Sequence, residues 1–323
     1  MDAMKKICSI IVTFNRKKLL ARCVRAELGQ TRRPEAVIIV DNASTDDTFG
    51  YLCGQKIIAP AAELRPEVMI ESVTEGMRVI YYRMPVNGGG AGGFHKGLEL
   101  AHGMNGFDAF WMMDDDGYPS PECLDKQLRY LDKYDYVMPV SINIEEHTQL
   151  SWATRLKKGG KTESYADLRA EWSEILSFVF PFNGSLLSKR IVDKVGYINP
   201  DLFIWGDDYE HYYRCLKAGF KPVTVLDAIF YHPANRAPVV PVMCGLFKVP
   251  YVDSKLRFTC LIRNWAYINK TNGRWFAAAK IFAAYTWLFL VSRGFDLEGY
   301  RHYLACTVDG FRGKFTRHLQ YLK

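Results

Sequence analysis

The chain has 323 residues, of which 49% are hydrophobic and 24% are charged, a balance that excludes wholesale disorder and allows one large domain or two modest ones. The eight cysteines form no CxxC pair, which favours reduced thiols over disulfides or zinc sites. The net charge is +7, but residues 255–323 carry 12 Lys and Arg against 3 Asp and Glu, or +9, which leaves −2 for the rest. No nucleic-acid motif accompanies this basic end, so we expect no nucleic-acid partner.

The first segments predict a strand, a helix and a second strand. Residues 7–13 and 36–40 are continuous apolar runs, typical of strands buried on both faces of a parallel sheet, and LLARCVRAEL between them has helical periodicity. Parallel strands end at the same edge of a sheet, so the polar residues that follow them should converge there. These residues are Thr13, Arg16, Asp41 and Asn42. Asp41 suits a hydrogen bond to a base or a ribose, but it could instead cap the next helix.

A glycine-rich stretch follows the third predicted strand, residues 78–83. Residues 87–93 read NGGGAGG and lead into a helical pattern. Closely spaced glycines let backbone N–H groups approach an anion, and a helix N-terminus adds partial positive charge, so phosphate is the expected guest. The stretch lacks GK[ST] and is not a P-loop, and a flexible loop is the alternative.

Three carboxylates, Asp114, Asp115 and Asp116, follow the apolar run of a fourth predicted strand, residues 106–113. Adjacent carboxylates repel one another unless a positive charge lies beside them, and a divalent cation shared with substrate phosphates would provide it. Carboxylates at the C-terminal end of a strand lie where open α/β sheets bind ligands. The alternative, a solvated acidic turn, is less expected directly after four large apolar residues.

Further polar features follow this triplet. Residues 143–172 are mixed and polar, which indicates a mobile loop over the site. Asp207 and Asp208 begin a predicted helix whose N-terminus would stabilise them ionised, and an ionised carboxylate is a candidate general base, although one of the two could simply cap the helix. His232 follows another predicted strand, residues 221–230. A lone His is most often structural, but its place in a chain rich in clustered acids is compatible with a metal role.

Six motifs between residues 7 and 232 occur in the order typical of one enzyme family. They are SIIVTFNR, VDNASTDDT, NGGGAGGFHKG, WMMDDDGYP, FNGSLLSKR and LFIWGDDYEHYYRCLKAG. With these motifs the sequence resembles a family 2 glycosyltransferase, and more narrowly the bacterial galactofuranosyltransferase-like and rhamnosyltransferase-like members. The resemblance implies the GT-A fold, an α/β fold with a mostly parallel central sheet flanked by helices, as a catalytic domain over residues 1–240.

The resemblance also implies how a sugar-nucleotide donor is held. Its nucleotide would be bound by Thr13, Arg16, Asp41 and Asn42, and its sugar and phosphates by Asn87, Gly88 and Gly89. Mn²⁺ or Mg²⁺ bridging the diphosphate would be bound by Asp116 and His232, and Asp114 would lie nearer the ribose or the metal. Asp115 would contact the sugar or the side chains that bind the metal.

The second acidic cluster would serve the acceptor. The resemblance implies that Asp208 is the catalytic base, with Asp207 next in line for this role. The acceptor site would contain Glu210, Asn183 and Trp205, whose flat ring suits a sugar.

The implied reaction is inverting, metal-dependent transfer of a sugar, best matched by galactofuranose from UDP-galactofuranose, to a glycan or a lipid-linked acceptor in cell-surface polysaccharide synthesis. One direct displacement on the anomeric carbon gives inversion, so the paired carboxylates of a hydrolase are not required. The alternatives are a rhamnosyltransferase that uses dTDP-rhamnose, a sugar nucleotidyltransferase, and a non-catalytic carbohydrate-binding protein.

Residues 241–323 form a basic, aromatic region in which we expect helices. Residues 275–291 are apolar, but Lys280 interrupts them and they fall short of the ~20 residues of a spanning helix. We expect an interfacial or buried helix, either at the inner face of the plasma membrane or packed on the catalytic domain or in a homo-oligomer. The first residues lead into a strand without a signal-peptide pattern, so the expected location is cytoplasmic, peripheral at that membrane.

Overall fold

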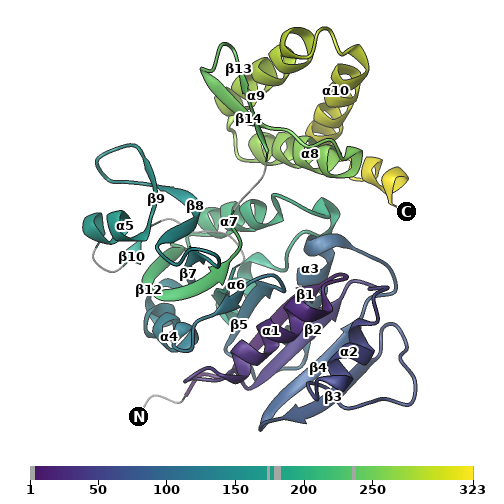
Figure 1. Cartoon of the computed structure of the whole chain (residues 1–323), viewed down its shortest axis with the longest axis vertical. Coiled ribbons are helices and arrows are strands. Elements are labelled where there is room, and N and C mark those ends of the chain that lie inside the picture. Colours follow the sequence, from purple (N-terminus) through teal and green to yellow (C-terminus); the bar gives the residue numbers. More distant parts are fainter. Residues whose placement is uncertain (1–3, 173–174, 178–182, 235–237, 323) are drawn as a thin grey trace. The chain divides into compact units, whose positions relative to one another are not determined.

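The computed structural model describes residues 4–172, 175–177, 183–234 and 238–322. The chain forms two compact units (Figure 1). Unit 1 consists of Met1–Pro200 and Arg214–Asn235, and unit 2 of Asp201–Tyr213 and Arg236–Lys323. The sequence predicts a catalytic domain over residues 1–240, whereas the segment that carries Asp207 and Asp208 groups with the C-terminal region.

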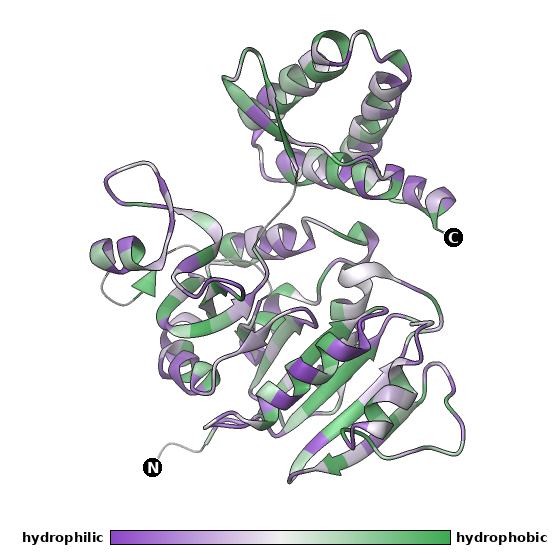
Figure 2. Cartoon of the chain, viewed as in Figure 1, coloured by the Kyte–Doolittle hydropathy of each residue, from purple (hydrophilic) through white to green (hydrophobic). Residues whose placement is uncertain are grey.

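Unit 1 is built on a mixed β-sheet (Figure 1). Its strands are β1 (Ile7–Thr13), β2 (Ala36–Asp41), β3 (Met69–Thr74), β4 (Met77–Arg83), β5 (Ala109–Asp114), β6 (Tyr118–Pro119), β7 (Tyr136–Asn143), β8 (Gln149–Arg155), β9 (Lys161–Ser164), β10 (Ile175–Leu176), β11 (Ser185–Ser188) and β12 (Val223–His232). The main path runs β10-β12-β7-β11-β5-β1-β2-β4-β3. β1 pairs in parallel with β2 and β5, whereas β11 runs antiparallel between β5 and β7. All residues of β1 and β2 are buried, as their unbroken apolar runs predict, and Figure 2 shows these strands as largely hydrophobic.

Helices cover both faces of this sheet. Those that begin in unit 1 are α1 (Lys17–Leu28), α2 (Thr48–Gly54), α3 (Gly89–Gly103), α4 (Cys123–Tyr134), α5 (Tyr165–Glu171) and α6 (Lys189–Val195), and α7 (Asp207–Lys217) begins in unit 2 and ends in unit 1. Ile7 and Ile11 of β1 share a core with Leu20 of α1 and Leu124 of α4. Ile10, the neighbour of Ile11 in β1, has its side chain on the opposite face, against α3.

The glycine-rich stretch is mostly helical. Gly89 starts α3, so residues 89–93 form its first turn and only Asn87 and Gly88 precede it. A Cβ atom on Gly97 would lie 2.3 Å from Cγ2 of Ile10, and one on Gly93 would lie 2.5 Å from Cγ1 of Val12. The flexible loop weighed as an alternative is therefore wrong for most of this stretch. Glycines at these two positions let the helix pack closely on β1.

Residues 143–172 are not an irregular loop. β8 pairs antiparallel with β7 and with β9, and α5 follows with the Ser164 hydroxyl capping its N-terminus. Leu150, Ser151 and Leu168 are buried. The polar composition of the segment reflects its exposed side chains, and its few buried residues are enough to fix it to the end of the sheet.

Glu27 of α1 is a fully buried carboxyl beneath the sheet. Its Oε1 atom accepts a hydrogen bond from Ser9, and its Oε2 atom has no partner among the described residues. Burial raises the pKa of Glu27 from 4.5 to about 8. Between these values the folded chain keeps a proton that the unfolded chain has released, so the free energy of unfolding falls as the pH rises through this window.

We expect Glu27→Gln to flatten this pH dependence, because the amide needs no proton to remain neutral. At the upper end of the window the variant should exceed the original chain in unfolding free energy by on the order of 3 kcal/mol. Denaturant unfolding followed by circular dichroism at both ends of the window measures this difference. Glu163→Gln, at an exposed position of β9, is the matched control. An unchanged pH slope in Glu27→Gln would contradict the assignment.

Unit 2 is a small helical unit with one hairpin. Its elements are β13 (Val239–Val242), β14 (Phe247–Pro250), α8 (Lys255–Thr271), α9 (Trp275–Trp287), a π-helical turn (Leu288–Ser292), α10 (Leu297–Arg312) and a 3-10 turn (Arg317–Tyr321). Its core contains aromatic side chains of each long helix, among them Phe258, Tyr285 and Tyr303. The predicted helical C-terminal region is thus confirmed.

Candidate active site

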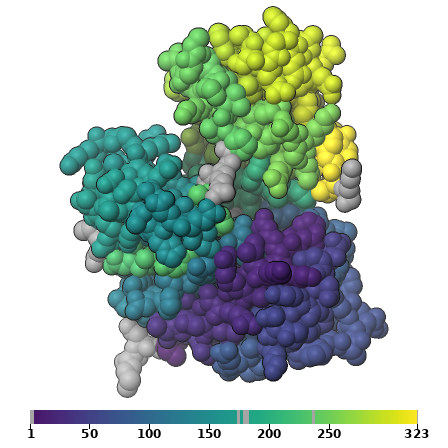
Figure 3. All heavy atoms as spheres, viewed as in Figure 1, coloured from purple at the N-terminus to yellow at the C-terminus, as the bar shows by residue number. Residues whose placement is uncertain are grey.

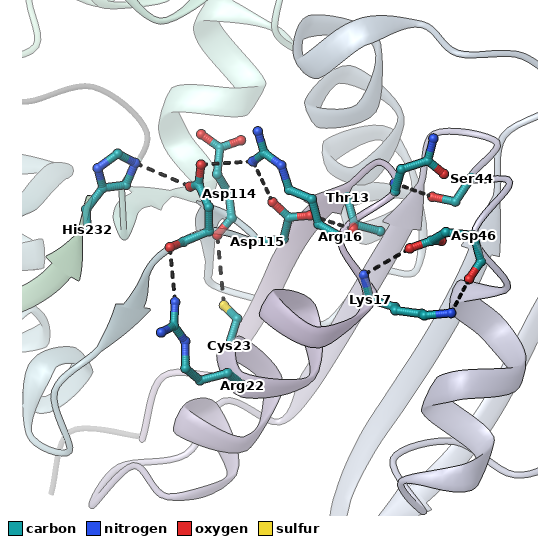
Figure 4. Close-up of polar contacts among 12 residues, drawn as sticks. Thr13, Arg16, Lys17, Arg22, Cys23, Ser44, Asp46, Asp114, Asp115 and His232 are labelled. Carbon is teal, nitrogen blue, oxygen red and sulfur yellow. Dashed lines mark hydrogen bonds and ion pairs between the residues drawn. The ribbon is translucent and has the colours of Figure 1, made fainter. Parts of the chain in front are cut away.

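The C-terminal ends of the parallel strands bring the predicted polar residues together at one edge of unit 1. Thr13 is paired with Asp41 across β1 and β2, and Val12 is paired with Asp114 across β1 and β5. The predicted convergence is therefore confirmed, and Figure 4 shows several of these side chains with their contacts. Because each side chain follows directly on a strand buried in the sheet, its backbone position is fixed.

Asp115 is the buried centre of the acidic triplet. One of its carboxylate oxygens accepts a hydrogen bond from Thr13 Oγ1 at 2.6 Å, and the other from Arg16 at 3.0 Å. Burial raises the pKa of Asp115 to about 6, against the opposing effect of Arg16 and Thr13. The same guanidinium reaches Asp116 Oδ2 at 2.8 Å. Arg16 thus supplies part of the positive charge that the sequence assigned to a cation alone, and its predicted contact with a nucleotide stays a prediction.

Asp116 and His232 form a second contact on the other side of the triplet. His232 Nε2 lies 3.3 Å from Asp116 Oδ1, a buried atom with no hydrogen-bond partner among the described residues. His232 Nδ1 lies 2.7 Å from the carbonyl oxygen of Pro233, which can only accept, so Nδ1 carries a proton. In the neutral imidazole this leaves the lone pair of Nε2 facing the carboxylate, whereas the imidazolium forms an ion pair with it. Two acceptors facing each other require a proton or a cation between them.

A divalent cation fits this pair. A carboxylate oxygen and a histidine Nε2 whose other nitrogen is fixed by a carbonyl are ordinary metal ligands. Among the described residues no group of three or more His, Cys, Asp or Glu side chains is arranged to hold a metal. Two protein ligands leave positions for phosphate oxygens and water, as Mg²⁺ sites in phosphate-binding enzymes do. The metal role of Asp114, which ends β5, stays a prediction.

Two of the residues predicted to bind the nucleotide differ in their hydrogen bonding: the Asp41 carboxylate is bonded within the chain, whereas the Asn42 side-chain oxygen is not. Asp41 is fully buried; its oxygens accept from the Ser44 N–H at 2.9 Å and from the Tyr81 hydroxyl. Asn42 donates to the carbonyl oxygen of Gly89 at 3.0 Å, and its own Oδ1 is buried with no hydrogen-bond partner among the described residues. Asn42 therefore has acceptor capacity left for a ligand, whereas Asp41 is already used by the chain itself.

The residues at the start of α3 are fixed locally. Asn87 Oδ1 accepts a hydrogen bond of 2.8 Å from the Gly89 N–H, and a Cβ atom on Gly88 would lie 3.4 Å from the Gly92 Cα atom. Their predicted contacts with the sugar and phosphates of a donor stay predictions. Asn183, predicted for the acceptor, is buried just before β11.

The sequence did not identify Trp152 as part of this site. Its ring is stacked on that of His232 with centroids 4.6 Å apart, and the neighbouring Ser151 hydroxyl donates to the His232 carbonyl oxygen at 2.9 Å. Two residues of β8 thus hold His232: Trp152 stacks on its ring, and Ser151 bonds its backbone carbonyl. No signal pointed to Trp152, because the pairing of β8 with β7 is invisible in a polar segment.

In unit 2, the pair Asp207 and Asp208 begins α7. Asp207 is buried, Asp208 is half-buried, and Asp208 Oδ1 accepts from the Tyr209 N–H at 2.7 Å. Burial raises the pKa of both carboxyls, and the neighbouring charge of Asp208 raises that of Asp207 further. Burial thus opposes the ionisation that the helix N-terminus favours, and it does so more strongly at Asp207 than at Asp208. The two groups favour one proton between them, on Asp207. Glu210, one turn along, is also buried.

The loop before this pair has an unusual backbone. Phe203 and Trp205 have φ values of 65° and 64°, in a region that bulky residues rarely adopt. Asn264 of α8 donates through Nδ2 to the carbonyl oxygens of Leu202, Ile204 and Trp205 at 2.9, 3.0 and 2.7 Å. The ring of Trp205, predicted to stack on a sugar, is half-buried against the core of unit 2. Its contact with an acceptor stays a prediction.

A buried arginine completes this support. Arg263 is fully buried and donates to the carbonyl oxygens of Leu202 at 2.9 Å and Phe315 at 3.1 Å, and it lies 2.7 Å from His318 Nδ1. Burial, together with the charge of Arg263, lowers the pKa of His318 to about 4, so this ring is neutral and accepts. α8 therefore positions the carboxylates of α7 through their loop. Sequence reading missed both α8 residues, because an Arg–Asn pair within a helix resembles a solvated face.

We expect Asn264→Ala to lower the free energy of unfolding by roughly 3 kcal/mol, because it removes the one amide that bonds three carbonyl oxygens of a strained backbone. Denaturant unfolding measures the change. Asn272→Ala, which removes a hydrogen bond to Ile268 and a longer one to Thr271 at the end of the same helix, is the matched control and should cost about 1 kcal/mol or less. Equal losses in the two variants would show that Asn264 does not hold the loop.

Comparison with known proteins identifies the family. The sequence model described as "Glycosyl transferase family 2" matches residues 8–196, more than half of the chain. The chain belongs to glycosyltransferase family 2. As a member of this family it is a glycosyltransferase, and the arrangement of strands and helices around the acidic triplet is the GT-A fold.

This family 2 glycosyltransferase has relatives along nearly its whole length. It is 28% identical over 319 residues to galactofuranosyltransferase GlfT1 of Mycolicibacterium smegmatis, covering 96% of this chain and 98% of the relative. It is 29% identical over 316 residues to GlfT1 of Mycobacterium tuberculosis strain H37Rv, covering 96% and 97%. A crystal structure of GalNAc-T7 with UDP, GalNAc and Mn²⁺ has a TM-score of 0.54 at 12% identity and covers 84% of this chain and 48% of that one, a likeness of fold alone. The predicted galactofuranosyltransferase-like resemblance is confirmed.

Proposed function

We propose that this family 2 glycosyltransferase is a metal-dependent, inverting galactofuranosyltransferase that uses UDP-galactofuranose. The contact of Asp116 Oδ1 with His232 Nε2 at 3.3 Å supports the metal dependence, because a carboxylate oxygen and an imidazole nitrogen so placed are ordinary ligands of a divalent cation. The relatives named galactofuranosyltransferase, which match over nearly the full length, support the donor sugar. The acceptor would be a glycan or a lipid-linked glycan of the cell surface, and the enzyme would work in the cytoplasm.

In this proposal Asp116 and His232 hold Mn²⁺ or Mg²⁺, and the metal neutralises the charge that develops on the departing nucleoside diphosphate. Arg16 keeps Asp115 and Asp116 in place, since its guanidinium bonds both carboxylates. Asn42 accepts a hydrogen bond from the nucleotide through its free Oδ1. Trp152 keeps the imidazole plane of His232 fixed by stacking.

Asp208 takes the proton of the acceptor hydroxyl as its oxygen attacks the anomeric carbon. The attack comes from the face opposite the departing diphosphate, which inverts the configuration. Desolvation of the half-buried Asp208 raises its pKa, which makes it a stronger base than an exposed carboxylate. Asp207 carries the proton that the pair shares, so it does not compete for this role.

A donor screen scored by the released product tests the proposal. The purified chain is incubated with UDP-galactofuranose, UDP-galactose, UDP-glucose or dTDP-rhamnose and a mixture of glycan and lipid-linked glycan acceptors, with and without EDTA. Release of UDP from UDP-galactofuranose that EDTA abolishes is expected. Release of dTDP from dTDP-rhamnose alone would identify dTDP-rhamnose as the donor instead. Activity in EDTA would overturn the metal role, and pyrophosphate as product would indicate a nucleotidyltransferase.

A further inference from the structure

α9 of unit 2 and the turn after it expose large apolar side chains. Within α9 only Ala284 and Tyr285 are buried. Exposed fractions are 59% for Trp275, 74% for Phe276, 43% for Phe282, 54% for Val291 and 72% for Phe295. We call these five residues the α9 face. Figure 3 shows atoms of this part of the chain on the surface of the C-terminal unit. A soluble protein rarely leaves so many aromatic side chains of one segment in water without a partner.

Basic side chains accompany the α9 face. Arg274, Lys280 and Arg293 are exposed at the start, in the middle and after the end of the helical segment. Residues 238–322 carry 12 Lys and Arg against 4 Asp and Glu, which is +8. Aromatic side chains bordered by cations match the interface of a bilayer that contains anionic lipids, where rings lie at headgroup level and ammonium or guanidinium groups meet phosphates.

The apolar surface continues inward. A cavity of about 300 Å³ opens between α8, α9 and α10, and its lining includes Ile262, Trp275, Phe282 and Phe311. Trp275 and Phe311 lie parallel beside it, with ring centroids 6.1 Å apart. Trp275 and Phe282 of the α9 face thus border an apolar cavity as well as solvent. The cavity adds apolar surface that lipid acyl chains can contact.

By length and composition the same helical segment could cross a membrane, contrary to the expectation from its apolar run, but it is anchored in unit 2. Trp275–Ser292 has the length and the composition of a span, and 22% of it is buried. Tyr285, Leu288 and Phe289 belong to the core that α8 and α10 share. A spanning arrangement would pull these side chains out of that core and place Lys280 in hydrocarbon. The arrangement that keeps the core intact lays the helix along the membrane surface.

We propose that the α9 face binds the surface of an anionic bilayer, with Trp275, Phe276 and Phe295 in the interface and Arg274, Lys280 and Arg293 at the lipid phosphates. This attachment is independent of the donor, the metal and the reaction. It fixes unit 2, which carries Asp207 and Asp208, at the lipid surface.

Sedimentation with vesicles tests this proposal on the full chain. Vesicles of phosphatidylcholine alone are compared with vesicles that also contain phosphatidylglycerol, in low and in high salt. We expect binding to the anionic vesicles that is at least about tenfold tighter and that weakens with salt, because each basic residue near such a surface adds attraction. Equal binding to both vesicle types, or none, would overturn the proposal.

Two variants identify the surface. Phe276→Ser combined with Phe295→Ser should lower partitioning into anionic vesicles by about tenfold or more, because both rings leave the interface. Val73→Ser, at an edge-strand position of unit 1 that is 76% exposed, is the matched control and should leave partitioning unchanged. Circular dichroism shows whether each variant is folded. A lipid-free dimer that the double variant dissociates would assign the face to a second copy of this chain, and resistance of the native protein to alkaline extraction from membranes would indicate a span. Either result would overturn the proposal.

Discussion

Asp116→Ala is expected to lower sugar transfer by about a thousandfold or more, because it removes the carboxylate that faces His232 and would hold the metal. The loss should appear in donor binding as well as in turnover. Calorimetric titration with UDP should show tight binding only when Mn²⁺ is present, and this metal-dependent gain should disappear in the variant. Asp125→Asn, which removes a carboxylate that pairs with Arg129 on the surface of α4, is the control and should bind and turn over normally.

A double variant makes the assignment sharper. If Asp116 and His232 hold one ion, then Asp116→Ala combined with His232→Ala should be hardly worse than either change alone, because each one already empties the site. Losses that multiply would show that the two side chains act separately. UDP binding by Asp116→Ala that still strengthens with Mn²⁺ would place the metal elsewhere.

Asp208→Asn is expected to lower kcat by about 10³-fold while the affinity for the donor stays nearly unchanged, because the amide cannot accept the acceptor's proton. Steady-state kinetics with UDP-galactofuranose, together with titration of UDP, separates the two effects. The acid limb of the pH profile of kcat/KM should lie above the ordinary range of a carboxyl group, since burial raises the pKa of Asp208 and only its ionised form is a base. Activity should therefore fall as the pH is lowered through this raised pKa.

Asp207→Asn is the informative comparison for this result. Burial and the charge of Asp208 keep Asp207 protonated, and an amide resembles a protonated carboxyl, so this variant should lose much less activity. Asp201→Asn, at an exposed position of the same unit, serves as the surface control. A larger loss at Asp207 than at Asp208 would reverse their roles.

The carboxylates themselves were predictable, but their counter-charges were not. Asp115 and Asp116 follow an apolar strand, and that position alone placed them at the ligand-binding edge. Arg16 also lies at that edge in the sequence prediction, yet its ion pairs with Asp115 and Asp116 depend on the register of β1 against β5. Whether an arginine contacts a nucleotide or a neighbouring carboxylate depends on the distances between them, and a pattern of residue types does not contain those distances.

The same limit explains the segment around β8. Its sequence is polar because most of its side chains face solvent, and polar composition is typical of a loop. The antiparallel pairing of β8 with β7 depends on backbone hydrogen bonds and a few buried residues such as Leu150. Trp152 reaches His232 only through that pairing.

For the acidic triplet and the pair on α7, the sequence by itself determined the fold family, the strands that end in acids and the residue types available for metal and proton chemistry, because buried parallel strands and helix starts leave strong local patterns. The tertiary structure alone decided which atoms face each other. It places Asp116 in contact with His232 and engages Asp41 in a hydrogen bond from the Ser44 N–H. It also holds the loop before Asp207 on α8 through hydrogen bonds from Asn264. It also decided the protonation of the α7 pair, since burial depends on contacts between residues far apart in the chain.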